Sequence, residues 1–298
     1  MPLPRLRAAL SALLLFAAPL SAKPPAPRPA AHPALWVVRK GGATVWLFGT
    51  IHALPAGFRW RNPKLDRSFA AARELVIEAK IDGDPAAAAA TFAKLAAPTQ
   101  TLPPLAERVA PFYRPALAAL EAKAGAPATT FNGMATWAAA FMLFGVSMGD
   151  LGVSAANGVE EVLKAQFNAA RKPIATLETA EQQLDILHDL PEAQQVEFLQ
   201  SVLEDPADDK REFAAMLAAW SKGDEAAISA SFDKDFKASP ALRDALLTRR
   251  NAAWADAIAK RLGQPGATLV AVGAGHLAGP GSVVHLLEAK GFRVDRVE

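Results

Sequence analysis

Short apolar runs with strand character lie near both ends of this chain, and long alanine-rich, amphipathic segments fill the middle. Residues 35–39 and 44–48 form two β-prone runs on either side of Gly41 and Gly42, which predicts a β-hairpin. The run "ELVIEA" at 74–79 predicts a short buried strand. The first part of the chain therefore favours a sheet.

A helix is predicted between the hairpin and this strand, because Asn62 is a favourable cap and Pro63 suits the first helical position. The order strand, loop, helix, strand indicates a right-handed parallel unit. Three further strands are predicted at 172–178, 268–276 and 292–297. The predicted strands thus lie mainly towards the two ends of the chain.

Helical segments are predicted over about 84–170 and about 180–262. The most apolar of them, at 133–148, contains Gly145 and is shorter than the roughly 20 residues that span a membrane, which indicates a buried helix or the lining of a groove. The whole pattern predicts an α/β fold. Its central mixed, mainly parallel sheet is built from N- and C-terminal segments, with a large helical insertion.

The first residues, 1–22, have the pattern of a secretory signal peptide. Arg5 and Arg7 precede an apolar run at 8–19, and small residues precede a cut near Ala22. This apolar run is too short to span a bilayer, which favours a cleaved signal peptide over a membrane anchor. No transmembrane span is expected after cleavage. The protein is expected to be periplasmic or secreted.

Cleavage would leave a Pro- and Ala-rich linker at 23–34 and one folded domain at 35–298. The full chain has 32 Lys and Arg against 30 Asp and Glu, and the signal peptide holds two of the basic residues, so 32 − 2 = 30 remain. A neutral mature chain without a basic stripe argues against nucleic acid as a partner. Because the chain has no cysteine, a metal site must use His, carboxylate or water.

Two histidines stand at equivalent places in the pattern. His52 follows Gly49 by three residues at the end of one apolar strand, and His276 follows Gly273 in the same way at the end of another. Glu78 stands at the end of the strand "ELVIE". Ligands of α/β sheets bind outside the carboxyl ends of parallel strands, so these side chains line one cleft if their strands are neighbours.

Two kinds of chemistry suit these residues. Imidazole is the commonest metal ligand and the commonest general base near neutral pH. Two histidines with a carboxylate suit a divalent metal such as Zn²⁺, Mn²⁺ or Co²⁺. The same groups also suit metal-free hydrolysis, with a histidine activating water and a glutamate orienting it. The P-loop pattern, the strict Gly-x-Gly-x-x-Gly fingerprint and the His-Glu-x-x-His motif are absent from the sequence.

Other polar residues have competing interpretations. Glu178 also ends a predicted strand, yet Thr179 and Gln182 form a capping-box pattern directly after it. Arg249 and Arg250 are expected either to bind an anion or to cover a helix surface. The remaining histidines are interpreted as a helical surface residue (His188), a helix residue (His285) and a linker residue (His32).

Over nearly all of its mature part, the chain resembles the TraB/PrgY/GumN family, and its bacterial GumN-like branch in particular. The resemblance rests on segments that occur in the family's order, namely "ALWVVRKGGATVWLFGTIHALP", "ELVIEA", "GVEEVL", "RKPIATLETAEQQL", "AAWSKGDEAAI", "LLTRRNAAWADAI" and "VAVGAGHLAGPGSVVHLLEAKGFRV". The resemblance implies one active site that contains two Gly-x-x-His motifs and a glutamate. The matching positions are Gly49, His52, Glu78, Gly273 and His276, with Arg250 at a further family position.

The family is similar to the TIKI proteins, which are metal-dependent proteases, and distantly to erythromycin esterases and haem-binding ChaN proteins. The resemblance implies a periplasmic metal-dependent hydrolase, in the first place a peptidase. In it, His52, Glu78 and His276 bind a divalent ion, Arg250 assists, and a peptide or other small substrate occupies a cleft. The alternatives are a metal-free esterase or amidase that uses the same residues, and a non-catalytic periplasmic protein that binds haem, a peptide or a polysaccharide.

Overall fold

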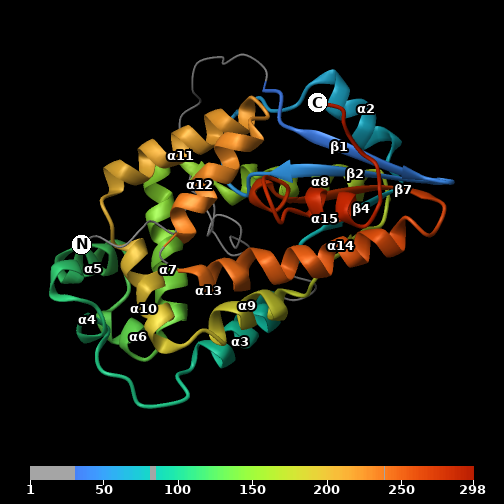
Figure 1. Cartoon of the computed structure of the whole chain (residues 1–298). Coiled ribbons are helices and arrows are strands. Elements are labelled where there is room, and N and C mark those ends of the chain that lie inside the picture. Colours follow the sequence, from blue (N-terminus) through green and yellow to red (C-terminus); the bar gives the residue numbers. More distant parts are fainter. Residues whose placement is uncertain (1–30, 81–84, 238) are drawn as a thin grey trace.

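A six-stranded sheet and a large group of helices make up the part of the chain that the computed structural model describes, residues 31–298 without 81–84 and 238 (Figure 1). The strands lie in the order β6-β4-β7-β2-β1-β8. They are β1 (Leu35–Lys40), β2 (Ala43–Thr50), β4 (Glu74–Ile77), β6 (Ile174–Thr176), β7 (Gly266–Gly273) and β8 (Val294–Arg296). A separate ladder pairs β3 (Leu54–Pro55) with β5 (Val153–Ser154). The predicted signal peptide lies outside the described residues.

The predicted hairpin is confirmed by β1 and β2, which pair antiparallel from Leu35 opposite Phe48 to Lys40 opposite Ala43. Gly41 in the turn has a φ of 55°. That left-handed conformation is available to glycine because it has no Cβ. Hydrophobic pattern and turn chemistry therefore act together to form this part of the sheet.

Three parallel pairings build the rest of the sheet around the site. β7 lies between β2 and β4, and β6 pairs with the other side of β4. The parallel direction predicted for β2 and β4 is correct, although β7 from the far end of the chain separates them. β1 and β8 pair antiparallel, so the sheet is mixed as predicted. The carboxyl ends of β6, β4, β7 and β2 consequently meet at one edge.

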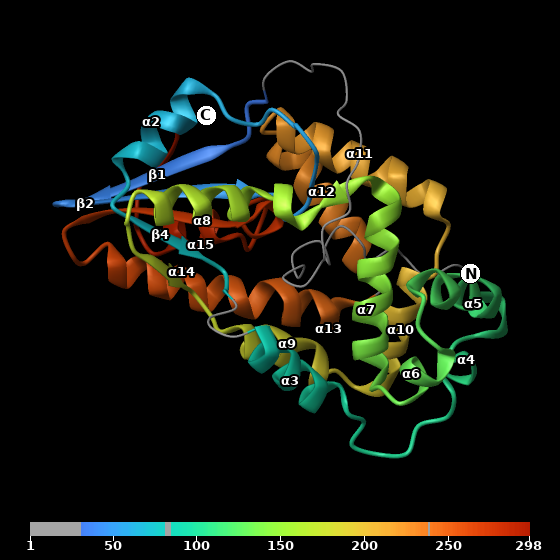
Figure 2. The same cartoon turned by 180° about the vertical axis from the view of Figure 1, so that it is seen from behind.

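Helices cover both faces of the sheet. Side chains along each strand point alternately to the two faces, and apolar clusters lie on both. Leu269 and Ala271 of β7 belong to the cluster with α2 and α8, whereas Val270 and Val272 belong to the cluster with α14 and α15. In Figure 2, α8 lies in front of the strands and α14 runs below them. The bounds of these helices are α2 (Pro63–Ala71), α8 (Val159–Ala169), α14 (Arg249–Arg261) and α15 (Val283–Ala289).

The remaining helices gather on one side of the sheet in both views (Figures 1 and 2). They are α3 (Pro85–Ala96), α4 (Leu105–Arg108), α5 (Arg114–Ala124), α6 (Ala128–Asn132), α7 (Thr136–Met148), α9 (Ala180–His188), α10 (Glu192–Val202), α11 (Pro206–Ser221), α12 (Glu225–Phe236) and α13 (Pro240–Arg243). The apolar helix α7 packs against α5, α9 and α10, which confirms the buried helix predicted at 133–148. Among the described residues, no helix has the length and apolar character to cross a membrane.

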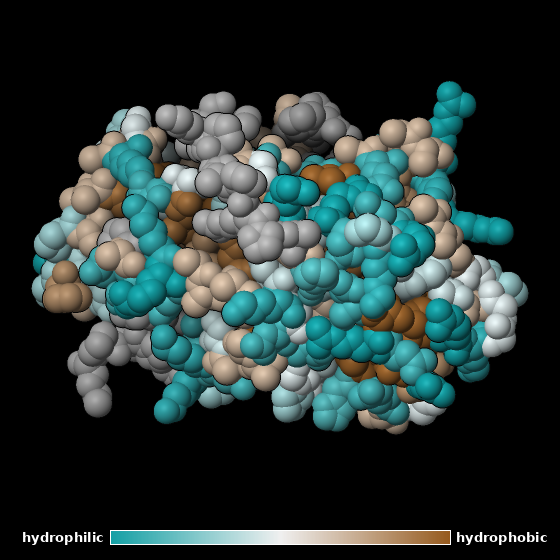
Figure 3. Space-filling model, turned by 90° about the horizontal axis from the view of Figure 1, so that it is seen from above, coloured by the Kyte–Doolittle hydropathy of each residue, from teal (hydrophilic) through white to brown (hydrophobic). Residues whose placement is uncertain are grey.

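The surface is largely polar. Seen from above, hydrophilic residues cover most of the visible face, and hydrophobic residues form only limited patches (Figure 3). Of the large hydrophobic side chains in the described part, Phe112 and Met142 are the exposed ones. The last residues of the predicted linker are attached to this body, because the Ala31 N–H donates to the Arg59 carbonyl and the His32 N–H donates to the Ser221 carbonyl.

Candidate active site at the carboxyl edge of the sheet

The two Gly-x-x-His segments lie side by side, because β2 and β7 pair in register up to Thr50 opposite Gly273. A Cβ on Gly49 would lie 3.1 Å from the Cα of Ala274, so the glycine allows the backbones to approach closely. His52 follows β2, and His276 closes the short 3₁₀ turn Ala274–His276 after β7. Both histidines therefore reach the same edge of the sheet.

His52 is held by a carboxylate from helix α8. Its Nδ1 lies 2.6 Å from Oε1 of Glu160, and the Thr50 hydroxyl donates to the same oxygen. Burial lowers the pKa of His52, but the negative charges of Glu160 and Glu78 outweigh it and raise the pKa from 6.5 to about 9. The Nε2 atom is buried, has no hydrogen-bond partner among the described residues, and lies 3.8 Å from Oε1 of Glu78. Glu160 thus fixes the orientation of the ring, and Nε2 faces Glu78.

His276 is fully buried and neutral. Burial, and then the positive charge of Arg250, lower its pKa well below 6.5. Its Nδ1 donates to Oδ1 of Asn251 at 2.6 Å, because Nδ2 of Asn251 donates to the Gly281 carbonyl and leaves the oxygen facing the ring. Its Nε2 lies 3.2 Å from Nη1 of Arg250 and must accept, since a guanidinium only donates. The ring rests against Trp254 at 4.3 Å between centroids.

Glu78 lies between the two histidines. Its Oε1 accepts from the Gly273 N–H at 2.7 Å and lies 3.9 Å from Nε2 of His276. Its Oε2 accepts from Nη2 of Arg250 at 2.7 Å and from Nε2 of Gln183 at 3.3 Å. Burial raises the pKa of Glu78, and the Arg250 charge opposes that shift. The glycine of the second motif therefore holds the carboxylate through its backbone.

Arg250 is the central cation of the cluster. Besides Glu78, it pairs with Glu178 through Nη2 and through Nε, which lies 3.1 Å from Oε1. The guanidinium carbon also lies 4.5 Å from the centre of the Trp254 ring. A π-helical turn at Asp244–Thr248 directly precedes α14, and Arg250 near the start of α14 is buried. Of the two alternatives given for these arginines, coverage of a helix surface is wrong for the buried Arg250 and correct for the exposed Arg249.

The structure thus brings His52, Glu78, His276 and Arg250 together, and Glu178 joins them through Arg250 and Gln183. The capping box predicted after Glu178 is also present at Thr179. The other histidines lie elsewhere: His32 contacts Glu298, His188 contacts Trp137, and His285 lies on α15.

Three polar partners were not identified from the sequence. Asn251 directly follows Arg250 and orients His276, while Gln183 bridges Glu78 and Glu178. Glu160 stands in "GVEEVL", a segment that served only as part of the family resemblance. The available signal was an acidic pair in the first turn after a glycine, which by itself describes any favourable helix start.

The side chains of His52, His276 and Glu78 have the chemistry of ligands for a divalent ion. Both histidines hold Nδ1 against an oxygen and turn Nε2 towards Glu78, as metal-ligating histidines do. The distances of 3.8 and 3.9 Å to Glu78 are wider than the roughly 3.0–3.5 Å between ligands of one small ion. In the described part of the chain, no three His, Asp or Glu side chains are placed to hold an ion as they stand. The donor chemistry fits a metal, and the spacing would have to contract.

Gly158 makes His52 sensitive to a small substitution. A Cβ at Gly158 would lie 2.0 Å from the carbonyl oxygen of His52. We expect Gly158→Ala to lower the free energy of unfolding by about 1–3 kcal/mol or more, because backbone must move. Gly145→Ala is the matched control, since no atom lies within 4 Å of its Cβ, and a helical alanine should be neutral or stabilising by up to about 1 kcal/mol. Urea denaturation checks both, and equal stabilities would contradict the expectation.

Comparison with known proteins identifies the family of this chain. A family model described as the TraB/PrgY/gumN family matches residues 34–296. Two relatives, from Escherichia coli (strain K12) and Shigella flexneri, carry the name "Uncharacterized protein YbaP"; each is 27% identical over 255 residues, which is 86% of this chain and 92% of the relative. No solved structure matches the chain. Because the family model spans most of the sequence, including both Gly-x-x-His segments and Glu78, the chain belongs to the TraB/PrgY/gumN family.

Proposed function

We propose that this protein is a hydrolase that cleaves amide or ester bonds, in the first place peptide bonds, at the carboxyl edge of the sheet. One observation carries the proposal: within the part of the chain that the structure describes, Nε2 of His52 is buried without a hydrogen-bond partner while its Nδ1 is fixed by Glu160. A histidine oriented by a carboxylate is the usual device for moving a proton during hydrolysis.

The residues divide the work in this proposal. When no metal ion is bound, Nε2 of His52 takes a proton from the attacking water and returns it to the leaving group, while Glu160 keeps the ring in one orientation. Glu78 orients the water between the two histidines, and Arg250 balances the buried carboxylates. Because the pKa of His52 is about 9 in the free protein, its basic form must be gained on ligand binding or at higher pH.

A divalent ion is part of the leading version of the proposal. Nε2 of His52, Nε2 of His276 and the Glu78 carboxylate would hold it, supported by the Nδ1 hydrogen bonds to Glu160 and Asn251. Such an ion lowers the pKa of a bound water towards 7. Ligation needs neutral histidines, so a proton on His52 competes with the metal.

A metal-free version is favoured by a different observation. Nη1 of Arg250 lies 3.2 Å from Nε2 of His276 and so takes the lone pair that a metal would need. In that version, His52 alone transfers the proton. Arg250 and the neutral His276 then keep Glu78 in place.

Metal content separates the two versions. We expect the purified protein to contain about one equivalent of a divalent ion, and His52→Ala and His276→Ala each to lose most of it, because each removes one ligand. His285→Ala is the control, since this histidine lies exposed on α15. Metal content is measured by elemental analysis. Hydrolysis of peptides and p-nitrophenyl esters is measured before and after EDTA treatment.

Activity that survives exhaustive EDTA treatment would favour the metal-free version. Equal metal content in both active-site variants would rule out the proposed ligand set. If His52→Ala hydrolysed every substrate at the wild-type rate, this result would contradict the proposed function itself.

A further inference from the structure

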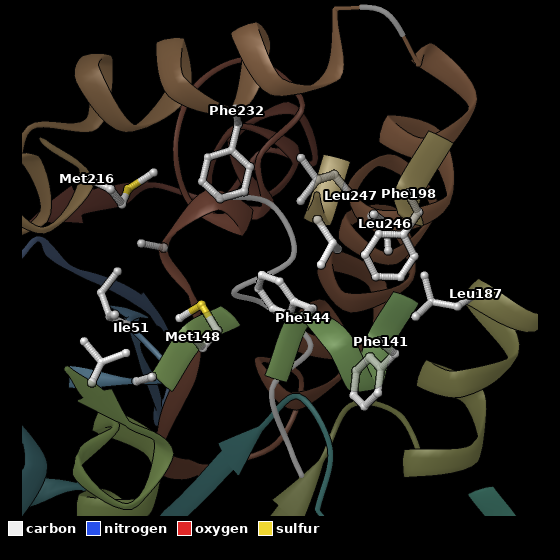
Figure 4. Packing of buried hydrophobic residues seen from close by; sticks show 14 of the residues in the cluster. Ile51, Phe141, Phe144, Met148, Leu187, Phe198, Met216, Phe232, Leu246 and Leu247 are labelled. Atoms are coloured by element: carbon white, nitrogen blue, oxygen red, sulfur yellow. The ribbon is translucent and has the colours of Figure 1, made fainter. Parts of the chain in front are cut away.

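A pocket opens directly beside His52, between the carboxyl edge of the sheet and helices α7, α11 and α12. Figure 4 shows Ile51, Met148, Met216, Phe144 and Phe232 around its space. The cavity volume is ≈ 60 Å³, which is smaller than the roughly 150 Å³ of a cavity that binds benzene. The pocket therefore fits a small group next to the proposed reacting atoms.

One face of α11 forms a wall of the pocket. Its lining residues recur at the spacing i, i+3, i+4 and i+7, which is one side of a helix. They are Asp209, Glu212, Phe213 and Met216. Met216 is buried, whereas the two carboxylates are partly exposed, and Glu212 pairs with Lys234 at 3.0 Å. The polarity thus changes from acidic at the exposed end of α11 to apolar inside.

The opposite wall comes from α7 and from the second Gly-x-x-His motif. Phe144, Ser147 and Met148 line the pocket from α7. The Phe232 ring packs onto Gly275, where a Cβ would lie 2.2 Å from the ring. Glycine at that position therefore lets an aromatic side chain close over the motif. Methionine side chains adapt to the shape of an apolar ligand, so the pocket can adjust to a short chain.

We propose that this pocket is the substrate subsite for a short, uncharged apolar chain attached to the carbonyl that is cleaved. The inference rests on the proposed hydrolase function for the position of the reacting carbonyl beside His52. Burial of apolar surface would supply the affinity. The carboxylates of Asp209 and Glu212 disfavour a chain that ends in an anion.

Binding can be tested without catalysis by NMR of methionine methyl groups labelled with ¹³C, using butanamide as the probe and acetamide as its short analogue. We expect butanamide to shift the Met148 and Met216 signals in a saturable way, with a dissociation constant about tenfold below that of acetamide. Met142 is the internal control, because it lies exposed on the same helix as Met148. Absence of saturable shifts at Met148 and Met216, or equal shifts at Met142, overturns the subsite.

Selectivity is the second readout. For p-nitrophenyl esters, kcat/KM should rise about 15-fold from acetate to butanoate, since each of the two added methylenes contributes about fourfold, and should not rise further to octanoate. Ser147→Trp, which fills the pocket, should bring the butanoate-to-acetate ratio near one, and Met216→Trp is the second such variant. Met142→Trp on the exposed face of α7 should keep the wild-type ratio.

The two proposals fail in different ways. Methyl shifts without hydrolysis of any peptide or ester leave the subsite standing and contradict the hydrolase. Hydrolysis with equal kcat/KM for acetate and butanoate, or an unchanged ratio in both filling variants, contradicts the subsite and leaves the hydrolase standing.

Discussion

Replacing Arg250 by methionine should lower the free energy of unfolding by about 3–5 kcal/mol, because it leaves two buried carboxylates without their cation. The Arg250 side chain is 5% exposed, and its partners Glu78 and Glu178 are 5% and 10% exposed. Methionine keeps much of the apolar contact with Trp254, so the lost charge dominates the effect. Urea denaturation at pH 7 measures it.

The neighbouring arginine provides a matched control. Arg249 is 75% exposed and pairs with the partly exposed Asp244, so Arg249→Met should change stability by less than about 0.5 kcal/mol. The double variant Arg250→Met/Glu178→Gln should recover part of the loss, because it removes one of the two unpaired charges. If the free energy of unfolding of Arg250→Met lay within about 1 kcal/mol of the wild-type value, the two carboxylates would be stabilised by groups other than Arg250.

Strand-end chemistry was predictable from the sequence because it depends on local patterns. The apolar runs before Gly49 and Gly273 marked the strands, and parallel strands place their carboxyl ends together. The hairpin was predictable for the same reason, since its β-prone runs and Gly41 act over a few residues. These local features carry His52 and His276 to one edge of the sheet.

The partners of these histidines were not predictable, because they come from distant helices. Glu160 reaches His52 from a helix that covers one face of the sheet, and Asn251 reaches His276 from a helix on the other face. Arg249 and Arg250 are adjacent and identical in type, yet one is exposed and the other is buried. The packing of α14 against the sheet, which two adjacent identical residues do not reveal, distinguishes them.

The order of strands was likewise a property of the whole fold. The sequence indicates a parallel unit from β2 and β4, but the insertion of β7 between them depends on pairing partners that are 223 residues apart for β2 and 194 residues apart for β4. That insertion is what places Glu78 next to the Gly273 N–H and between both histidines. The candidate site therefore exists only once both ends of the chain share one sheet.

Replacing Glu160 by glutamine should lower catalysed hydrolysis by about 10²–10⁴-fold, because His52 loses the carboxylate that orients it. The same change should lower the pKa of His52 from about 9, since the Glu160 charge and hydrogen bond cause the upward shift. Glu161→Gln is the matched control, because Glu161 is the next residue and pairs with Lys164 on the surface. Activity assays and NMR titration of the His52 ring in metal-free protein measure the two effects.

The pKa of His52 also predicts how stability depends on pH. A proton bound more tightly in the folded state stabilises fully below the unfolded pKa of 6.5, and the contribution is lost as pH rises through about 9. This amounts to roughly 3 kcal/mol in the wild type. Besides Glu160, the charged groups that act on His52 are Glu78 and Arg250. Glu160→Gln should remove most of the decline in unfolding free energy between pH 6.5 and 9, and Glu161→Gln should retain it. A Glu160→Gln protein in which His52 still titrates near pH 9 would show that Glu160 does not control this histidine.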